Sequence, residues 1–158
     1  MGATASVFAG AAPTAEEAYT GSGLALQAGQ RVRPRLSLLA RLAWTHSREE
    51  DPDDFDDFTW HERLDRFAVD GAVRGYAGDH VWFEASAGPV LVYQRWSRSD
   101  RPGSSSDSEV GLDTSVAIGV DLLPSRSISP HLEGRAGVQR VSDVTAIDLS
   151  FGVGIDWH

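Results

Sequence analysis

The chain has 158 residues, 41% of them hydrophobic, with no cysteine and a formal net charge of −9. This length suits one domain, which we expect to span residues 1–158. The absence of cysteine excludes disulfides, thiolate metal sites and cysteine nucleophiles. No stretch approaches the roughly 18 uninterrupted apolar residues of a helical membrane span.

The negative charge is concentrated in one segment. Residues 45–62 hold eight acids and one arginine, so this segment carries −7 and the rest of the chain only −2. That distribution argues against nucleic acid as a partner. The run D-P-D-D-F-D-D-F-T-W-H-E does not fit an EF-hand, because Phe55 stands at a ligand position and Asp56 where glycine is needed. We expect a solvated acidic loop here, with a weak divalent-ion site as the alternative.

Eight segments alternate apolar with small or polar residues, as β-strands with two different faces do. The last is the clearest: its odd positions from Ile147 to Trp157 are all apolar, and the even positions are Asp, Ser or Gly. Its length matches the about 9 to 11 residues of a tilted strand that crosses a membrane. Pro89 lies inside the fifth segment, where we expect a β-bulge. The expected strands are residues 3–11, 19–31, 36–45, 63–76, 81–96, 110–122, 128–141 and 147–157.

The connections between these strands alternate in length. Those after the first, third and fifth strands are long or polar, at residues 12–19, 46–62 and 97–109, and those after the second, fourth and sixth are tight. Long loops at one end and short turns at the other are typical of an up-and-down barrel. The sequence therefore predicts an all-β protein: a closed, eight-stranded, antiparallel, up-and-down transmembrane β-barrel.

Charged residues on the faces opposite the apolar ones would share the barrel interior. The interior of an eight-stranded barrel is just wide enough for side chains. These charges must therefore neutralise one another, because a buried unpaired charge costs several kcal/mol. We expect this network to plug the lumen, with a gated pore or proton path as the alternative. The expected luminal polar network comprises Arg41, Arg66, Asp70, Arg74, Glu84, Asp113, Asp121, His131, Glu133, Arg135, Asp148 and Asp156.

Aromatic residues cluster near the expected strand ends. Amphipathic rings prefer the two membrane interfaces, where they form girdles around a barrel. The expected aromatic girdle comprises Trp44, Trp60, Tyr93 and Trp96 near the long-loop end, and Tyr76, Trp82 and Trp157 near the short-turn end.

Catalysis has little support in the sequence. The five histidines show neither H-E-x-x-H nor a ligand pair at helical spacing. His46 is next to Ser47, but neighbours in a strand point to opposite faces and cannot form a working pair. We therefore expect no enzyme, no cofactor and no metal site.

Three strand phrases carry a family resemblance: F-E-A-S-A-G-P-V-L-V-Y, S-P-H-L-E-G-R-A-G-V and L-S-F-G-V-G-I-D-W. With them the whole chain resembles the small eight-stranded outer-membrane β-barrels, such as the membrane domain of outer-membrane protein A. The resemblance implies a porin-like architecture, a bacterial outer-membrane location and contact with a lipid bilayer or detergent. It also implies a structural or surface-interaction role, with other envelope proteins as partners of the long loops.

Two alternatives share the same alternation. A soluble eight-stranded barrel that binds an apolar ligand would turn the apolar face inward, and a barrel subunit of a larger assembly would use an apolar exterior for packing. The charged face is rich in Gly, Ala and Ser, which fits a narrow lumen better than a free surface. This favours the membrane barrel.

Overall fold

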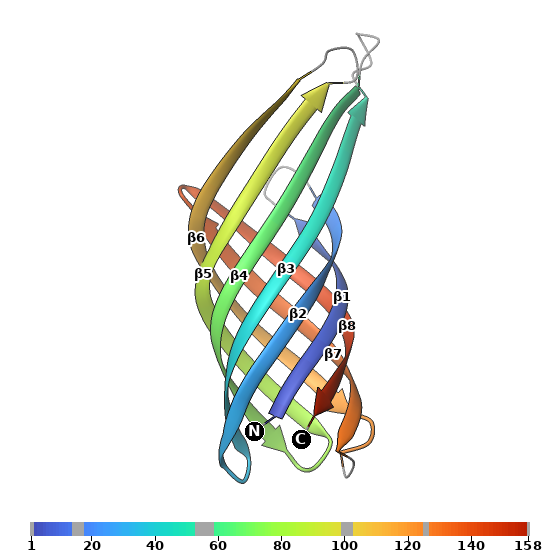
Figure 1. The fold of residues 1–158 in the computed structure, drawn as a ribbon, viewed down its shortest axis with the longest axis vertical. Coiled ribbons are helices and arrows are strands. Elements are labelled where there is room, and N and C mark those ends of the chain that lie inside the picture. Colours follow the sequence, from blue (N-terminus) through green and yellow to red (C-terminus); the bar gives the residue numbers. More distant parts are fainter. Residues whose placement is uncertain (1, 14–17, 53–58, 99–102, 125–126, 158) are drawn as a thin grey trace.

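The computed structural model describes residues 2–13, 18–52, 59–98, 103–124 and 127–157. These residues form antiparallel strands, and each strand pairs with the next along the chain. β1 also pairs with β8, from Ala3↔Trp157 to Ala11↔Leu149, so the sheet closes on itself (Figure 1). The predicted all-β, antiparallel, up-and-down order is confirmed. The strands are β1 (Gly2–Pro13), β2 (Ala18–Arg33), β3 (Leu36–Pro52), β4 (Thr59–Ala77), β5 (Val81–Arg98), β6 (Ser104–Asp121), β7 (Ile128–Val141) and β8 (Val144–Trp157).

The two faces of the sheet are the reverse of those in a water-soluble domain. On β6, Val116 is 60% exposed, whereas Asp113 is 3% exposed. Only six apolar residues are buried among the described ones, and four of them are alanines. Among the side chains that the structure describes, large apolar ones therefore cover the outside and polar ones fill the inside. None of the described segments forms a helix that is long and apolar enough to cross a bilayer.

The bulge expected at Pro89 is absent. The β4–β5 pairs Ala68↔Val90 and Gly71↔Ala87 have the same register on both sides of the proline. Pro89 itself pairs with Leu112 of β6. Between these two pairs, Val69 and Asp70 of β4 have no pairing partner on β5. The ladder is thus interrupted beside the residue that lacks an N–H, without the extra residue that defines a bulge.

Four strands continue well beyond the others at one end of the barrel (Figure 1). Pairing of β2 with β3 ends at Gly21↔Ser47, and pairing of β6 with β7 ends at Gly111↔Val141. Beyond these points β3, β4, β5 and β6 still pair with one another. We call this part the strand extension; it consists of residues 48–52, 59–63, 95–98 and 104–110.

The strand extension corrects the predicted long loops. Much of residues 46–62 and 97–109 is strand, and Glu49, Glu50, Asp51 and Glu62 lie in β3 and β4. Periodicity gives no signal here, since neither face of such a strand is apolar. The remaining acids of the acidic segment, within residues 53–58, lie outside the described residues.

The opposite end carries the β2–β3, β4–β5 and β6–β7 turns and both chain ends (Figure 1). Gly78 has φ 79°, a left-handed conformation that glycine adopts without strain, and it allows the short β4–β5 turn. We call this the turn end. The polar lumen lies between it and the strand extension.

Candidate functional site

Arg74 of β4 is the centre of the polar lumen. It is 2% exposed, and its Nε and Nη2 donate to Glu84 Oε2 at 3.0 and 2.9 Å. Nη2 also donates to Gln27 Oε1 at 2.6 Å, and Nη1 lies 3.5 Å from Asp156 Oδ1. Its guanidinium carbon is 3.9 Å from the centroid of the Trp82 ring, a cation–π contact. One side chain thus links β2, β4, β5 and β8.

Glu84 extends the network across the barrel. Its Oε1 accepts hydrogen bonds from Gln27 Nε2 at 2.9 Å and from Arg135 Nη2 at 2.8 Å. Arg135 also donates to Ser115 Oγ at 2.9 Å and lies 3.8 Å from Glu133 Oε2. These contacts join strands that are not neighbours in the sheet. The centre of the lumen is therefore filled by a cross-linked set of buried charges.

The half of the lumen nearer the strand extension is looser. Arg41 Nη1 donates to Asp70 Oδ2 at 3.0 Å, and Arg66 Nη1 donates to Gln139 Oε1 at 3.1 Å. Arg41, Arg66, Asp113 and Gln139 line a cavity of ≈ 60 Å³. That volume holds only a few water molecules.

The structure places the predicted luminal residues as follows. Arg66 and Asp148 are half-buried. The other ten are at most 8% exposed: Arg41, Asp70, Arg74, Glu84, Asp113, Asp121, His131, Glu133, Arg135 and Asp156. Gln27 and Ser129, which are 4% and 0% exposed, also lie in the lumen and are absent from the predicted network. Neither carries a charge, although Gln27 shares its face with the buried Ala25.

Trp82 does not belong to the aromatic girdle. It is 0% exposed, and its Nε1 donates to Asp121 Oδ1 at 3.1 Å inside the lumen. Its cross-strand partner is Gly119, where any Cβ would overlap the indole ring. The alternation of the strand indicates an inward Trp82, because Trp82 is two residues from the inward Glu84 and next to the outward Phe83.

Of the other predicted girdle residues, Trp60, Tyr76, Trp96 and Trp157 lie near strand ends, whereas Trp44 lies in the middle of β3 and Tyr93 lies five residues before the end of β5. Trp157 is 41% exposed at the turn end. At the same end, the guanidinium carbon of Arg31 lies 5.1 Å from the centroid of the Tyr76 ring. Trp44 stacks on His46, with ring centroids 6.2 Å apart. Tyr93 and Trp96 of β5 are half-buried, and Trp60 lies in β4. The side chain of Trp60 lies outside the described residues.

His46 and Ser47 point to opposite faces. Ser47 is 4% exposed in the lumen, whereas His46 Nδ1 lies 2.9 Å from Asp65 Oδ1 on the outer face. Asp65 Oδ2 also accepts from Arg63 Nε at 2.9 Å. The adjacent serine therefore does not reach this histidine.

Comparison with known proteins gives a likeness in fold. No family model matches the chain, and no curated protein matches its sequence. Among solved structures, Ail, the attachment invasion locus protein of Yersinia pestis, superposes with a TM-score of 0.69 at 10% identity, over 99% of this chain and 98% of that one. A major outer membrane protein from Thermus thermophilus gives 0.64 at 17% identity, over 98% of this chain and 99% of that one. The outer membrane enzyme PagL gives 0.54 at 16% identity, over 98% of both chains. The chain therefore has the fold of the small outer-membrane β-barrels.

Proposed function

We propose that residues 1–158 form one outer-membrane domain: a closed eight-stranded barrel with a sealed lumen, which presents the strand extension at the bacterial surface. The observation that carries this proposal is the inverted distribution of side chains. Outward residues such as Leu26, Val116 and Phe151 are 59%, 60% and 76% exposed. Soluble monomers rarely expose apolar patches larger than a few hundred Å². Such residues lie on the outer faces of strands β2 to β8. A lipid bilayer is the environment that suits a belt of this extent.

The soluble alternative requires the opposite interior. A barrel that binds an apolar ligand would line its cavity with apolar side chains. Here seven carboxylates and four guanidiniums occupy the lumen among the described residues. A barrel subunit of an assembly would also have an apolar exterior, and lipid accessibility distinguishes it from a membrane barrel.

The strand extension supports a surface-interaction role. Residues 104–110 of β6 pair with β5 and have no pairing partner on the β7 side among the described strands. An unpaired strand edge can accept an extended segment of another protein. We infer that such a segment is neutral or basic, because residues 45–62 carry −7. Ail was crystallised in complex with the heparin analogue sucrose octasulfate. The negative charge of residues 45–62 does not favour such an anionic ligand for this chain.

We infer no enzymatic activity for the barrel. PagL shows that this fold can carry an enzyme. The one serine–histidine pair that is adjacent in the sequence is split between the lumen and the outer face.

Epitope insertion tests the proposed orientation. A peptide epitope inserted between residues 100 and 101 should bind antibody on intact cells, since those residues connect β5 and β6 at the strand extension. The matched control is the same epitope between Pro34 and Arg35, in the β2–β3 turn at the turn end. It should bind antibody only after the outer membrane is permeabilised. Equal labelling of both insertions on intact cells would contradict the orientation.

A further inference from the structure

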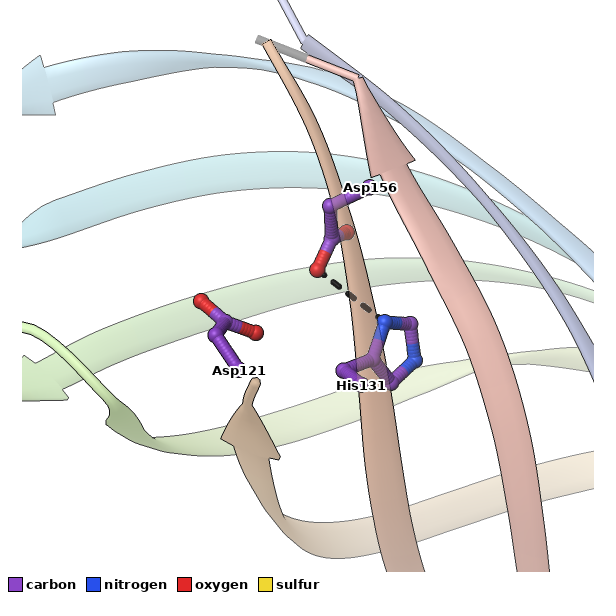
Figure 2. A group of neighbouring side chains, drawn as sticks. All are labelled: Asp121, His131 and Asp156. Atoms are coloured by element: carbon purple, nitrogen blue, oxygen red, sulfur yellow. Dashed lines mark ion pairs between the residues drawn. The ribbon is translucent and has the colours of Figure 1, made fainter. Parts of the chain in front are cut away.

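Three ligand-bearing side chains meet inside the lumen near the turn end: Asp121 of β6, His131 of β7 and Asp156 of β8. They are 2%, 1% and 3% exposed, and one oxygen or nitrogen atom from each lies within 4.8 Å of the others. Figure 2 shows the three side chains converging, with His131 Nδ1 3.1 Å from Asp156 Oδ2. Pairing of Asp121 with His131 across β6 and β7 fixes two of the three positions.

The ring of His131 lies between carboxylates without a well-formed hydrogen bond: its Nδ1 is close to Asp156 Oδ2, but the contact is an ion pair. Neither ring nitrogen of His131 makes a hydrogen bond with a described residue, although the ring is almost completely buried. Glu133 Oε2 is 4.0 Å from its Nε2, and Trp82 contacts the ring edge-on at 5.7 Å between centroids. Buried polar groups are nearly always hydrogen-bonded or coordinated. The contacts with Asp156 and Glu133 supply charge but no hydrogen bond, so a ring nitrogen is available to coordinate a metal ion.

The surrounding groups would orient metal ligands. Trp82 Nε1 donates to Asp121 Oδ1 at 3.1 Å, and Arg74 Nη1 lies 3.5 Å from Asp156 Oδ1. Such outer contacts hold one oxygen of each carboxylate and direct the other oxygen towards a metal. Asp121 also lines an open cavity of ≈ 720 Å³ at the turn end.

The charge balance of the lumen points the same way. Seven carboxylates face four guanidiniums among the described residues, a formal excess of three negative charges. Asp121, Glu133 and Asp156 surround His131. The ion pairs of Asp156 and Glu133 lead on to Arg74, Arg135 and Glu84, so this set has four carboxylates and two guanidiniums. A divalent cation would offset the local excess of two, and buried charges need such compensation.

We propose that Asp121, His131 and Asp156 form a binding site for a divalent first-row transition-metal ion, with Zn²⁺ as its representative. One imidazole and two carboxylates favour such an ion over Ca²⁺ or Mg²⁺, which prefer oxygen ligands alone. Zn²⁺ ligands lie about 2.0 to 2.2 Å from the ion. The ligand atoms, which lie within 4.8 Å of one another, must therefore move closer together through small side-chain adjustments when the ion binds. Three protein ligands would leave a fourth position for water. The site lies inside the barrel and is independent of what surrounds the exterior.

Calorimetric titration of the folded, chelator-treated protein with ZnCl₂ tests the site. We expect one Zn²⁺ per chain, and at least about 100-fold weaker binding in Asp121→Asn and His131→Gln, because even outer-contact changes cost about 10- to 100-fold. A shift of migration on a denaturing gel with and without boiling checks that each variant folds. The control variant replaces the seven acids from Glu49 to Asp57 by amides. It should bind one Zn²⁺ per chain with the affinity of the wild-type protein.

Two results would overturn the proposal: no zinc binding by the wild-type protein, or loss of binding in the amide variant alone, which would assign the ion to the acidic segment. If the luminal variants do not fold, the visible spectrum of the Co²⁺-loaded wild-type protein decides. A low-coordinate site with nitrogen ligation gives an intense band. The weak band of an oxygen-ligated, six-coordinate ion would contradict the site.

Discussion

Arg74→Leu should destabilise the folded barrel by about 3 to 5 kcal/mol, because removing one partner of a buried ion pair leaves the other charge uncompensated. Arg74 makes contacts with Glu84, Gln27 and Asp156 and stacks on Trp82. Leucine satisfies none of these groups. The measurement is the free energy of unfolding in a urea titration of the protein in lipid vesicles.

The matched control is Arg63→Leu, which also breaks an arginine–carboxylate pair on β4. The Arg63 side chain is 54% exposed and its partner is Asp65. Exposed pairs contribute about 0 to 1 kcal/mol, so this variant should stay close to the wild type. Adding Glu84→Gln to Arg74→Leu should restore part of the lost free energy of unfolding, since it removes the negative charge that Arg74→Leu leaves unpaired. Equal decreases in the free energy of unfolding for Arg74→Leu and Arg63→Leu would show that the lumen is hydrated and that Arg74 is not in a desolvated ion pair.

Val116→Arg should cost about 2 to 4 kcal/mol in vesicles, as expected for arginine on the lipid face near the bilayer midplane. Val116 is 60% exposed and lies on the outer face of β6. The same substitution at Val110 is the matched control. Val110 is 71% exposed on the same face and strand, about 20 Å away within the strand extension.

Val110→Arg should change the free energy of unfolding by about 0 to 1 kcal/mol, because arginine near or beyond the interface remains hydrated. Both substitutions are outward, so only their depth differs. Similar costs at Val110 and Val116 would be inconsistent with a membrane belt that ends below the strand extension.

The strands inside the belt could be predicted from the sequence because their two faces differ. Outward positions such as Leu112 and Ile118 are apolar, and inward positions such as Asp113 and Ser115 are polar. This contrast fixes both the period and the phase of a strand. The strand extension could not be found in the same way, since the run S-S-S-D-S-E of residues 104–109 has no apolar face and reads as a loop.

The candidate sites show a similar limit. Alternation assigns a residue to the lumen, and it placed Arg74 and Glu84 there, but it does not say which luminal residues touch. Arg135 reaches Glu84 across 51 residues of sequence, and Asp121, His131 and Asp156 meet only because β6, β7 and β8 are adjacent. Trp82 was misplaced because its residue type was given more weight than its phase.

The central claim is that the apolar face of the barrel meets lipid and the charged face lines a lumen. Because the chain has no native cysteine, single cysteines can be placed at each position from Leu112 to Ile118 and labelled with a fluorophore. The measurement is quenching by a lipid-attached nitroxide in vesicles. If the apolar face meets lipid, quenching is strong at Leu112, Thr114, Val116 and Ile118 and weak at the positions between them. Uniform quenching along β6, or the opposite phase, would contradict this claim.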